Sequence, residues 1–185
     1  MLTKNIKFTN FRGNTNSSNK KKLAKILKNK NLVIEIPLLK SLSKDYQLSY
    51  SKKLVSSLKK FKKINLIGMG GSILGTQAIY DFLKDKITKK INFFDNLQSR
   101  EFNTNKEKNI NIIVSKSGNT LETITNHNLI SLKEKKNKNL FITETKDSFL
   151  TQLANKLKAE IIEHKNFIGG RYSVLSEVGM LPAEL

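Results

Sequence analysis

The chain of 185 residues contains no cysteine. This absence excludes disulfides, thiolate nucleophiles and zinc sites with cysteine ligands, and it favours a reducing compartment. The sequence also has no stretch that approaches the ~18–20 apolar residues of a membrane-spanning helix. Its first residues, MLTKNIKFTNFRG, lack the apolar core of a signal peptide. We therefore predict a cytoplasmic protein without a membrane partner.

Acidic residues are few, 15 against 34 lysines and arginines, and the formal net charge is +19. A surplus of this size indicates anionic partners, nucleic acid among them. Only three of the basic residues are arginines, however, and the lysines are scattered among asparagines rather than interleaved with aromatic side chains. An AT-rich genome would enrich lysine and asparagine on any surface. We therefore expect mostly solvated lysines and do not expect nucleic acid as the main partner.

Hydrophobic residues make up 38% of the sequence and gather in short runs, which suffices for one domain with a core. Residues 1–60 are interpreted as an extended and helical lead-in, with apolar residues at helical spacing in 21–29 and from Tyr46 to Phe61. Pro37 argues against a central strand in the apolar segment around it.

From residue 61 onward, short apolar runs alternate with helical patterns. Strands are predicted at 64–70, 91–95, 111–115, 139–144 and 159–164, and helices at 72–84, 120–135 and 147–158. This alternation predicts an α/β fold with a parallel five-stranded sheet flanked by helices on both faces. Residues 169–185 begin as a glycine turn and end inside a helical pattern without a cap, so we expect the domain at 61–185 to be truncated at its C-terminus.

Three loops carry the residues with chemistry. The first, GMGGSILG at 68–75, follows the first strand, and its glycines expose backbone N–H groups to an anion. Ser72 is expected to cap the following helix. Ile73 breaks a dinucleotide fingerprint, and Thr76 and Gln77 break a Walker loop. A tight turn without a ligand remains the alternative.

The second loop, SKSGNTLET at 115–123, follows the third strand. Three of its hydroxyls lie at a predicted helix start, where they offer neutral donors to a doubly charged phosphate. Asn119 and Glu122 have the spacing of a capping box. Because ligands of open parallel sheets bind beyond the carboxyl ends of the strands, we expect this loop and the first to face one pocket. The alternative is a serine-rich cap that satisfies its own backbone.

The third loop, FIGGRYSVLS at 167–176, places Arg171 behind two glycines. A guanidinium group keeps its charge and can stabilise an anionic intermediate without exchanging protons. A structural arginine that pairs with an acid or a helix C-terminus is the alternative.

In this order and with these separations, GMGGSILG, SKSGNTLET and GGRYSVLSEVGMLPA resemble the N-terminal half of the phosphoglucose isomerase family, which is built from sugar isomerase (SIS) domains. The resemblance covers residues 64–185. It implies an SIS-type, Rossmann-like fold and an aldose–ketose isomerase of glycolysis and gluconeogenesis that interconverts glucose 6-phosphate and fructose 6-phosphate through an enediolate. It further implies no cofactor, no metal and a homodimer for the full-length form.

The resemblance also assigns roles to individual residues. Contacts with the sugar phosphate are implied for Gly71, Ser72, Ser115, Lys116, Ser117 and Thr120. Arg171 matches the arginine that the family places beside the reacting carbons, where it stabilises the enediolate as a catalytic residue. Glu122 matches an acid that could orient a catalytic group, although helix capping explains it equally well.

Proton transfer between C1 and C2 requires a carboxylate base and a group that opens the sugar ring. In the family the glutamate base, the ring-opening histidine and a further lysine come from the C-terminal half, which has no match in these residues. His127 and His164 lie outside the family's motifs and are expected to be ordinary surface or core residues, and Glu177 has no role beyond that of a helical carboxylate. We therefore expect little or no turnover from this chain alone. The alternative function is a stand-alone SIS module that binds a phosphosugar and regulates a partner.

Overall fold

The computed structural model describes residues 17–29, 36–97, 109–133 and 137–185. The chain divides into two compact units, Met1–Leu39 and Lys40–Leu185. The first contains helix α1 (Ser17–Leu27), which confirms the helix predicted there. The 3-10 helix η1 (Pro37–Leu42) follows. Residues 1–16 of the predicted lead-in lie outside the described residues, and helix α1 begins at Ser17, ahead of the helical spacing predicted from residue 21. None of the helices in the described ranges is both long and apolar enough to cross a membrane.

The second unit is built on five parallel strands in the order β2-β1-β3-β4-β5. The strands are β1 (Lys63–Ile67), β2 (Lys90–Phe94), β3 (Ile110–Val114), β4 (Lys138–Thr143) and β5 (Glu160–Glu163). Short, β-branched apolar runs form strands that are buried on both faces, as is typical of parallel sheets. All five strands fall where the sequence predicts them, which confirms the α/β class and the five-stranded parallel sheet.

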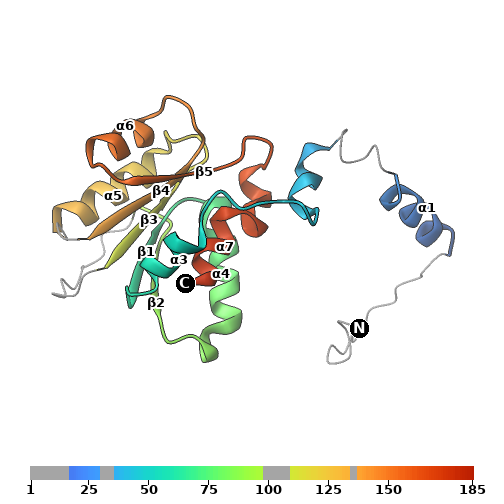
Figure 1. Ribbon diagram of the computed structural model, residues 1–185, viewed down its shortest axis with the longest axis horizontal. Coiled ribbons are helices and arrows are strands. Elements are labelled where there is room, and N and C mark those ends of the chain that lie inside the picture. Colours follow the sequence, from blue (N-terminus) through green and yellow to red (C-terminus); the bar gives the residue numbers. More distant parts are fainter. Residues whose placement is uncertain (1–16, 30–35, 98–108, 134–136) are drawn as a thin grey trace. The chain divides into compact units, whose positions relative to one another are not determined.

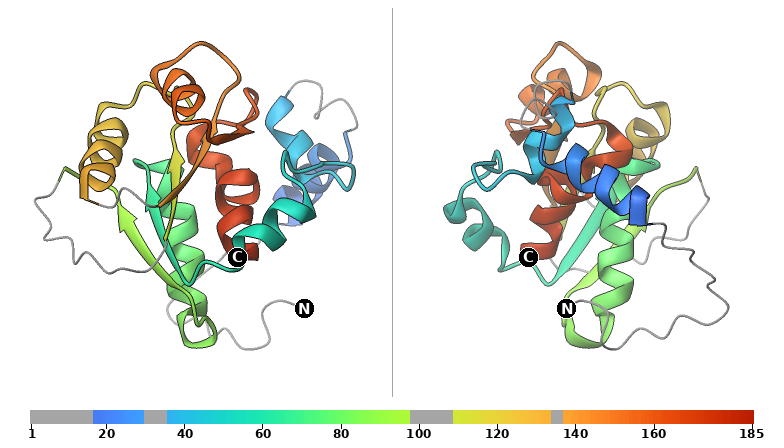
Figure 2. Two further views of the ribbon diagram at one scale, coloured as in Figure 1. Left: turned by 60° about the vertical axis from the view of Figure 1, so that its left-hand side comes forward. Right: turned by 90° about the vertical axis from the view of Figure 1, so that its right-hand side faces the viewer.

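Helices cover both faces of this sheet (Figures 1 and 2). Ile64 and Leu66 of β1 share one core cluster with α3 (Lys52–Leu58), α4 (Gly71–Leu83) and α7 (Glu177–Glu184). Ile67 belongs to a second cluster with α5 (Leu121–Lys133) and α6 (Phe149–Lys156). Alternate residues of a strand point to opposite faces, and the three-layer arrangement follows from that alternation.

Helix α3 is shorter than the segment of helical spacing from Tyr46 to Phe61. It begins at Lys52 because Ser51 caps it, with the Ser51 side chain accepting a hydrogen bond from the backbone N–H of Leu54. Leu54 and Leu58 are buried in the core that also contains β1. Residues 40–60, which the sequence assigned to the lead-in, therefore belong to the unit that contains the sheet.

A row of asparagines crosses the sheet on the same face as Ile67. The side chain of Asn92 donates to Asn65, Asn65 donates to Asn111, and Asn111 donates to Asn139, each at 2.9 Å. These asparagines are register partners in neighbouring strands. A shifted register would leave buried amides without hydrogen-bond partners. The row therefore fixes the register of β1 against β3, and the loops that follow these two strands begin at the same edge of the sheet.

Candidate functional site

The topological switch of the sheet lies between β1 and β3, because β2 and β3 occupy opposite sides of β1. The glycine loop (residues 68–71) follows β1, and the hydroxyl loop (residues 115–120) follows β3. A Cβ placed on Gly68 would lie 3.1 Å from the carbonyl oxygen of Val114, so the two loops begin in contact. Open parallel sheets bind ligands at this position.

Three hydroxyls of the hydroxyl loop form a compact triangle. The Ser115 Oγ lies 2.8 Å from the Thr120 Oγ1 and 3.4 Å from the Ser117 Oγ, and the third side measures 3.5 Å. Ser115 is buried, Thr120 is half-buried and Ser117 is exposed, so the triangle opens to solvent on one side. Hydroxyl protons can rotate, and the group can turn up to three donors toward an anion.

Gly118 gives the hydroxyl loop its shape. Its φ of +72° lies in the left-handed region that favours glycine, and a Cβ there would lie 2.1 Å from the Ser148 Oγ. The backbone N–H of Gly118 donates to the Ser115 Oγ at 3.2 Å. The loop is therefore bent back toward β3 and pressed against the start of α6.

The predicted capping box of Asn119 and Glu122 is wrong. Helix α5 begins at Leu121, two residues after Asn119, and the Asn119 Oδ1 accepts a hydrogen bond from the backbone N–H of Phe149 at 2.8 Å. Asn119 therefore ties the hydroxyl loop to the first turn of α6. Glu122 lies in the first turn of α5, half-buried, where its charge complements the helix dipole.

Helix α4 begins at Gly71 with Gly70 before it and without a side-chain cap. Ser72 lies inside the first turn rather than at the cap, which corrects the prediction, and only 9% of its surface is exposed. The N-terminus of α4 presents the positive end of its dipole at the switch point, beside the hydroxyl loop.

The third loop packs directly on the glycine loop. We call residues 168–171 the arginine loop. A Cβ on Gly71 would lie 2.2 Å from the carbonyl oxygen of Gly170 and 2.7 Å from the backbone nitrogen of Arg171. The Ser173 Oγ donates to the carbonyl oxygens of Gly170 at 2.7 Å and Gly71 at 3.2 Å. The structure therefore brings all three predicted loops together.

The Arg171 side chain is exposed. None of the described carboxylates forms an ion pair with it. The described residues therefore do not support the alternative of a structural arginine that pairs with an acid. Helix α7 follows this loop, and the Thr76 Oγ1 of α4 donates to the carbonyl oxygen of Val178 at 3.0 Å.

The Lys116 amine binds partners that lie outside the hydroxyl loop. Its Nζ donates to the carbonyl oxygen of Asn166 at 2.8 Å and pairs with the Glu144 carboxylate at 3.4 Å. Asn166 belongs to the loop after β5, and Glu144 follows β4. Lys116 thus connects the loops that follow three strands.

Both histidines are buried. His127 is 2% exposed on α5, and its ring packs at 5.7 Å from the ring of Phe141. His164 is 1% exposed after β5. That both are ordinary residues stays a prediction.

Burial lowers the pKa of both His127 and His164 below the ordinary value of 6.5. Below about pH 6.5 the histidines of the unfolded chain therefore bind protons that the folded chain excludes. The free energy of unfolding should fall in this range as the pH drops. Each histidine contributes a loss of up to ~1.4 kcal/mol for every pH unit. Urea unfolding at pH 7 and pH 5 measures this loss. We expect His127→Gln to reduce it, and an equal loss in that variant would contradict the assignment.

Sequence reasoning missed Glu177. Its carboxylate is fully buried at the start of α7, where it accepts hydrogen bonds from the backbone N–H of Ser49 at 2.8 Å and from the Tyr46 hydroxyl at 3.1 Å. Both partners are more than 120 residues away in the chain. No local pattern signals such a contact, although a carboxylate among the apolar positions of a helix is a weak hint.

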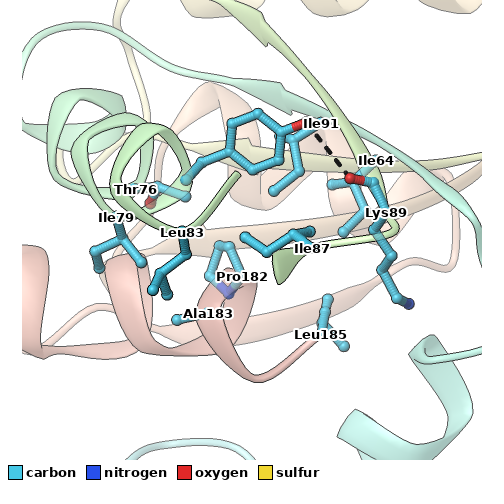
Figure 3. A pocket seen from close by; sticks show the side chains of 11 residues that line it. Ile64, Thr76, Ile79, Leu83, Ile87, Lys89, Ile91, Pro182, Ala183 and Leu185 are labelled. Carbon is cyan, nitrogen blue, oxygen red and sulfur yellow. Dashed lines mark hydrogen bonds between the residues drawn. The ribbon is translucent and has the colours of Figure 1, made fainter. Parts of the chain in front are cut away.

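An apolar cavity of about 90 Å³ lies elsewhere in the unit, between α4, β2 and the end of α7 (Figure 3). Ile79, Leu83 and Pro182 are among its lining residues. The amine of Lys89 at its rim is already bound, since it donates to the carbonyl oxygens of Lys59 and Phe61. The polar loops at the switch point are therefore the better candidate for a ligand.

The chemistry available at the switch point is anion binding. It combines three hydroxyls, the N-termini of α4 and α5, and the exposed guanidinium of Arg171. In the described parts of the chain, no group of three or more histidine, aspartate or glutamate side chains could hold a metal ion.

Solved structures of other proteins share the fold. A hypothetical protein of Thermus thermophilus aligns with a TM-score of 0.68 at 21% identity, over 91% of this chain and 42% of its own. The tagatose-6-phosphate ketose/aldose isomerase of Escherichia coli aligns with a TM-score of 0.57 at 16% identity, over 81% of this chain and 42% of its own.

Curated relatives are closer in sequence. The glucose-6-phosphate isomerase of Campylobacter jejuni is 35% identical over 65% of this chain, and that of Methanocaldococcus jannaschii is 37% identical over 68%. In both cases the match covers 33% of the relative's length. A probable glucose-6-phosphate isomerase of Methanococcus maripaludis is 31% identical over 96% of this chain and 43% of its own length.

The sequence profile of the phosphoglucose isomerase family matches residues 18–185. That range contains all three loops that meet at the switch point, together with the helices and strands that place them. The chain therefore belongs to the phosphoglucose isomerase family.

Proposed function

We propose that this chain is the sugar-phosphate-binding part of an isomerase that interconverts glucose 6-phosphate and fructose 6-phosphate. The observation that carries the proposal is the triangle of Ser115, Ser117 and Thr120 hydroxyls at the switch point. Three neutral donors beside two helix N-termini suit a phosphate dianion, which has more acceptor oxygens to satisfy than a carboxylate. Membership of the family and the names of its curated relatives support the same substrate.

The remaining loops suit the reacting end of the sugar. Gly71 and Ser72 start α4 next to the arginine loop, and the exposed Arg171 can approach a ligand that extends from the hydroxyl loop. Its guanidinium would stabilise the enediolate that forms when a proton moves between C1 and C2, because it supplies positive charge without titrating. Glu122 would orient a catalytic group from the start of α5.

The complete reaction is proposed for a longer, cytoplasmic and homodimeric form. The match covers a third of the Campylobacter jejuni relative's length, and a base and a ring-opening group remain to be supplied from outside the three loops. Glu177 is fully buried and engaged with Tyr46, so it is not placed to serve as that base. We expect the predicted domain at 61–185, together with residues 40–60 of the same compact unit, to act as the SIS domain, and we expect the 185-residue chain to show little or no turnover alone.

Thermal unfolding with fructose 6-phosphate tests the phosphate site. At about 100 times the dissociation constant, the ligand should stabilise the wild type by ~2.7 kcal/mol and raise Tm by roughly 5–10 °C. The double variant Ser115→Ala, Thr120→Ala should lose this rise, because two of the three donors are gone. The exposed pair Ser56→Ala, Thr145→Ala is the control and should keep it. An unchanged rise in the first pair would overturn the assignment.

A further inference from the structure

Lys116 is held at both ends. Its carbonyl oxygen accepts a hydrogen bond from the backbone N–H of Glu144 at 3.3 Å, and its amine pairs with the carboxylate of the same residue at 3.4 Å. The amine of Lys146 also binds that carboxylate. Burial alone would raise the pKa of Glu144, but the amines of Lys146 and Lys116 lower it below its ordinary value. Glu144 is therefore charged at neutral pH and orients the Lys116 side chain toward the loop after β5.

The other partner of this amine lies on the path to Arg171. Asn166, whose carbonyl oxygen accepts from the Lys116 Nζ at 2.8 Å, is five residues before Arg171. The chain turns tightly around both residues, with the N–H of Ile168 donating to the carbonyl oxygen of Lys165 at 3.1 Å and the N–H of Tyr172 donating to that of Gly169 at 2.9 Å. Ile168 itself is fully buried. The segment 165–171 is short and held by these contacts, so the position of Asn166 constrains that of Arg171.

The far end of the same segment is supported by the glycine loop. The backbone of Gly170 and Arg171 packs against Gly71 with no room for a Cβ between them. The arginine loop is thus held between two supports, Lys116 on the side of β3 and Gly71 on the side of β1. The first support is a single charge-assisted hydrogen bond of 2.8 Å at the protein surface.

We propose that Lys116 is a positioning residue, whose ammonium group holds the carbonyl of Asn166 and thereby sets the place of Arg171, while the hydroxyl triangle takes the phosphate. The proposal rests on the proposed function for what the loops bind. It differs from a direct contact between the Lys116 amine and phosphate, because the amine acts through its bond to Asn166.

Amide hydrogen exchange in the ligand-free chain tests the mechanical part. In Lys116→Met, the amides of Ile168 and Tyr172, which are hydrogen-bonded within this segment, should exchange about tenfold faster than in the wild type. Lys116→Arg should restore the protection, because a guanidinium can also donate to the carbonyl. Lys146→Met is the matched control: it removes the other lysine on Glu144 without touching Asn166 and should leave exchange unchanged. Equal protection in Lys116→Met and wild type would overturn the proposal.

Binding of two probes tests the functional part. One is inorganic phosphate, and the other is a five-carbon aldonate 5-phosphate, whose carboxylate mimics the charge of the enediolate. The dissociation constant of Lys116→Met for phosphate should lie within about twofold of that of Lys146→Met, which also lacks one positive charge. Its dissociation constant for the aldonate should be about tenfold higher than that of Lys146→Met. The double variant Lys116→Met, Arg171→Met should lose no more affinity for the aldonate than Arg171→Met alone, because the two residues act as one unit.

If Lys116→Met lost as much affinity for phosphate as for the aldonate, the result would indicate a direct contact between Lys116 and phosphate and would overturn the positioning role. If the wild type binds neither probe, the proposed function fails, and hydrogen exchange still decides the role of Lys116.

Discussion

Replacing Gly71 by alanine should abolish sugar-phosphate binding and lower the free energy of unfolding by about 3 kcal/mol. The added Cβ would lie 2.2 Å from the carbonyl oxygen of Gly170, 2.4 Å from its carbonyl carbon and 2.7 Å from the backbone nitrogen of Arg171. All three atoms are backbone and cannot rotate aside. The glycine loop and the arginine loop would have to move apart, and α4 and Arg171 would no longer approach one ligand.

Gly170→Ala is a matched control on the other side of the same contact. A Cβ on Gly170 meets nothing within 4 Å, so this variant should stay within about 1 kcal/mol of the wild type. Urea unfolding measures stability, and the rise in Tm with fructose 6-phosphate measures binding. If Gly71→Ala keeps both wild-type stability and the ligand-dependent rise, the two loops do not pack as described.

Replacing Glu177 by alanine should cost about 3–4 kcal/mol, although the residue is outside the proposed site. Its fully buried carboxylate binds the backbone N–H of Ser49 and the hydroxyl of Tyr46. Burial raises the pKa of Tyr46 and the charge of Glu177 raises it further, so the phenol stays a donor at neutral pH. Alanine would leave both donors without their acceptor and would open a cavity at the start of α7.

Glu177→Gln keeps an acceptor oxygen and nearly the same volume, so it should lose only about 1 kcal/mol. Tyr46→Phe removes a single donor and should fall between the two. Chemical unfolding gives these values, and hydrogen exchange at the Ser49 amide reports the contact directly. A loss below about 1 kcal/mol in Glu177→Ala, equal to that of Glu177→Gln, would show that the buried carboxylate contributes no net stability.

The strands and most helices could be predicted because their signals are local. The run INIIV forms the fully buried strand β3, and INLI and NLFIT form its two neighbours, since short β-branched runs between helical patterns have few other ways to fold. Helix starts were less predictable. Asn119 and Ser72 have the residue types of caps, but Asn119 binds the first turn of α6 and Ser72 lies within the first turn of α4.

Composition was similarly incomplete as a guide to the asparagines. An AT-rich genome would enrich asparagine on any surface, so most of them are expected there. In the fold, Asn65, Asn92, Asn111 and Asn139 form a hydrogen-bonded row inside the sheet. This arrangement depends on the strand order and register, which no single strand encodes.

By itself, the sequence determined the fold class and the places of the three loops along the chain, because periodicity, turn residues and helix starts are properties of neighbouring residues. Tertiary structure alone decided which of these residues meet. The contact of Gly71 with Gly170, the binding of Lys116 to Asn166 and the bonding of Glu177 to Tyr46 join residues separated by 50 to 131 positions. Such pairs form only when the sheet order and the packing of helices on its faces bring their elements together, since the chain between them imposes no fixed distance.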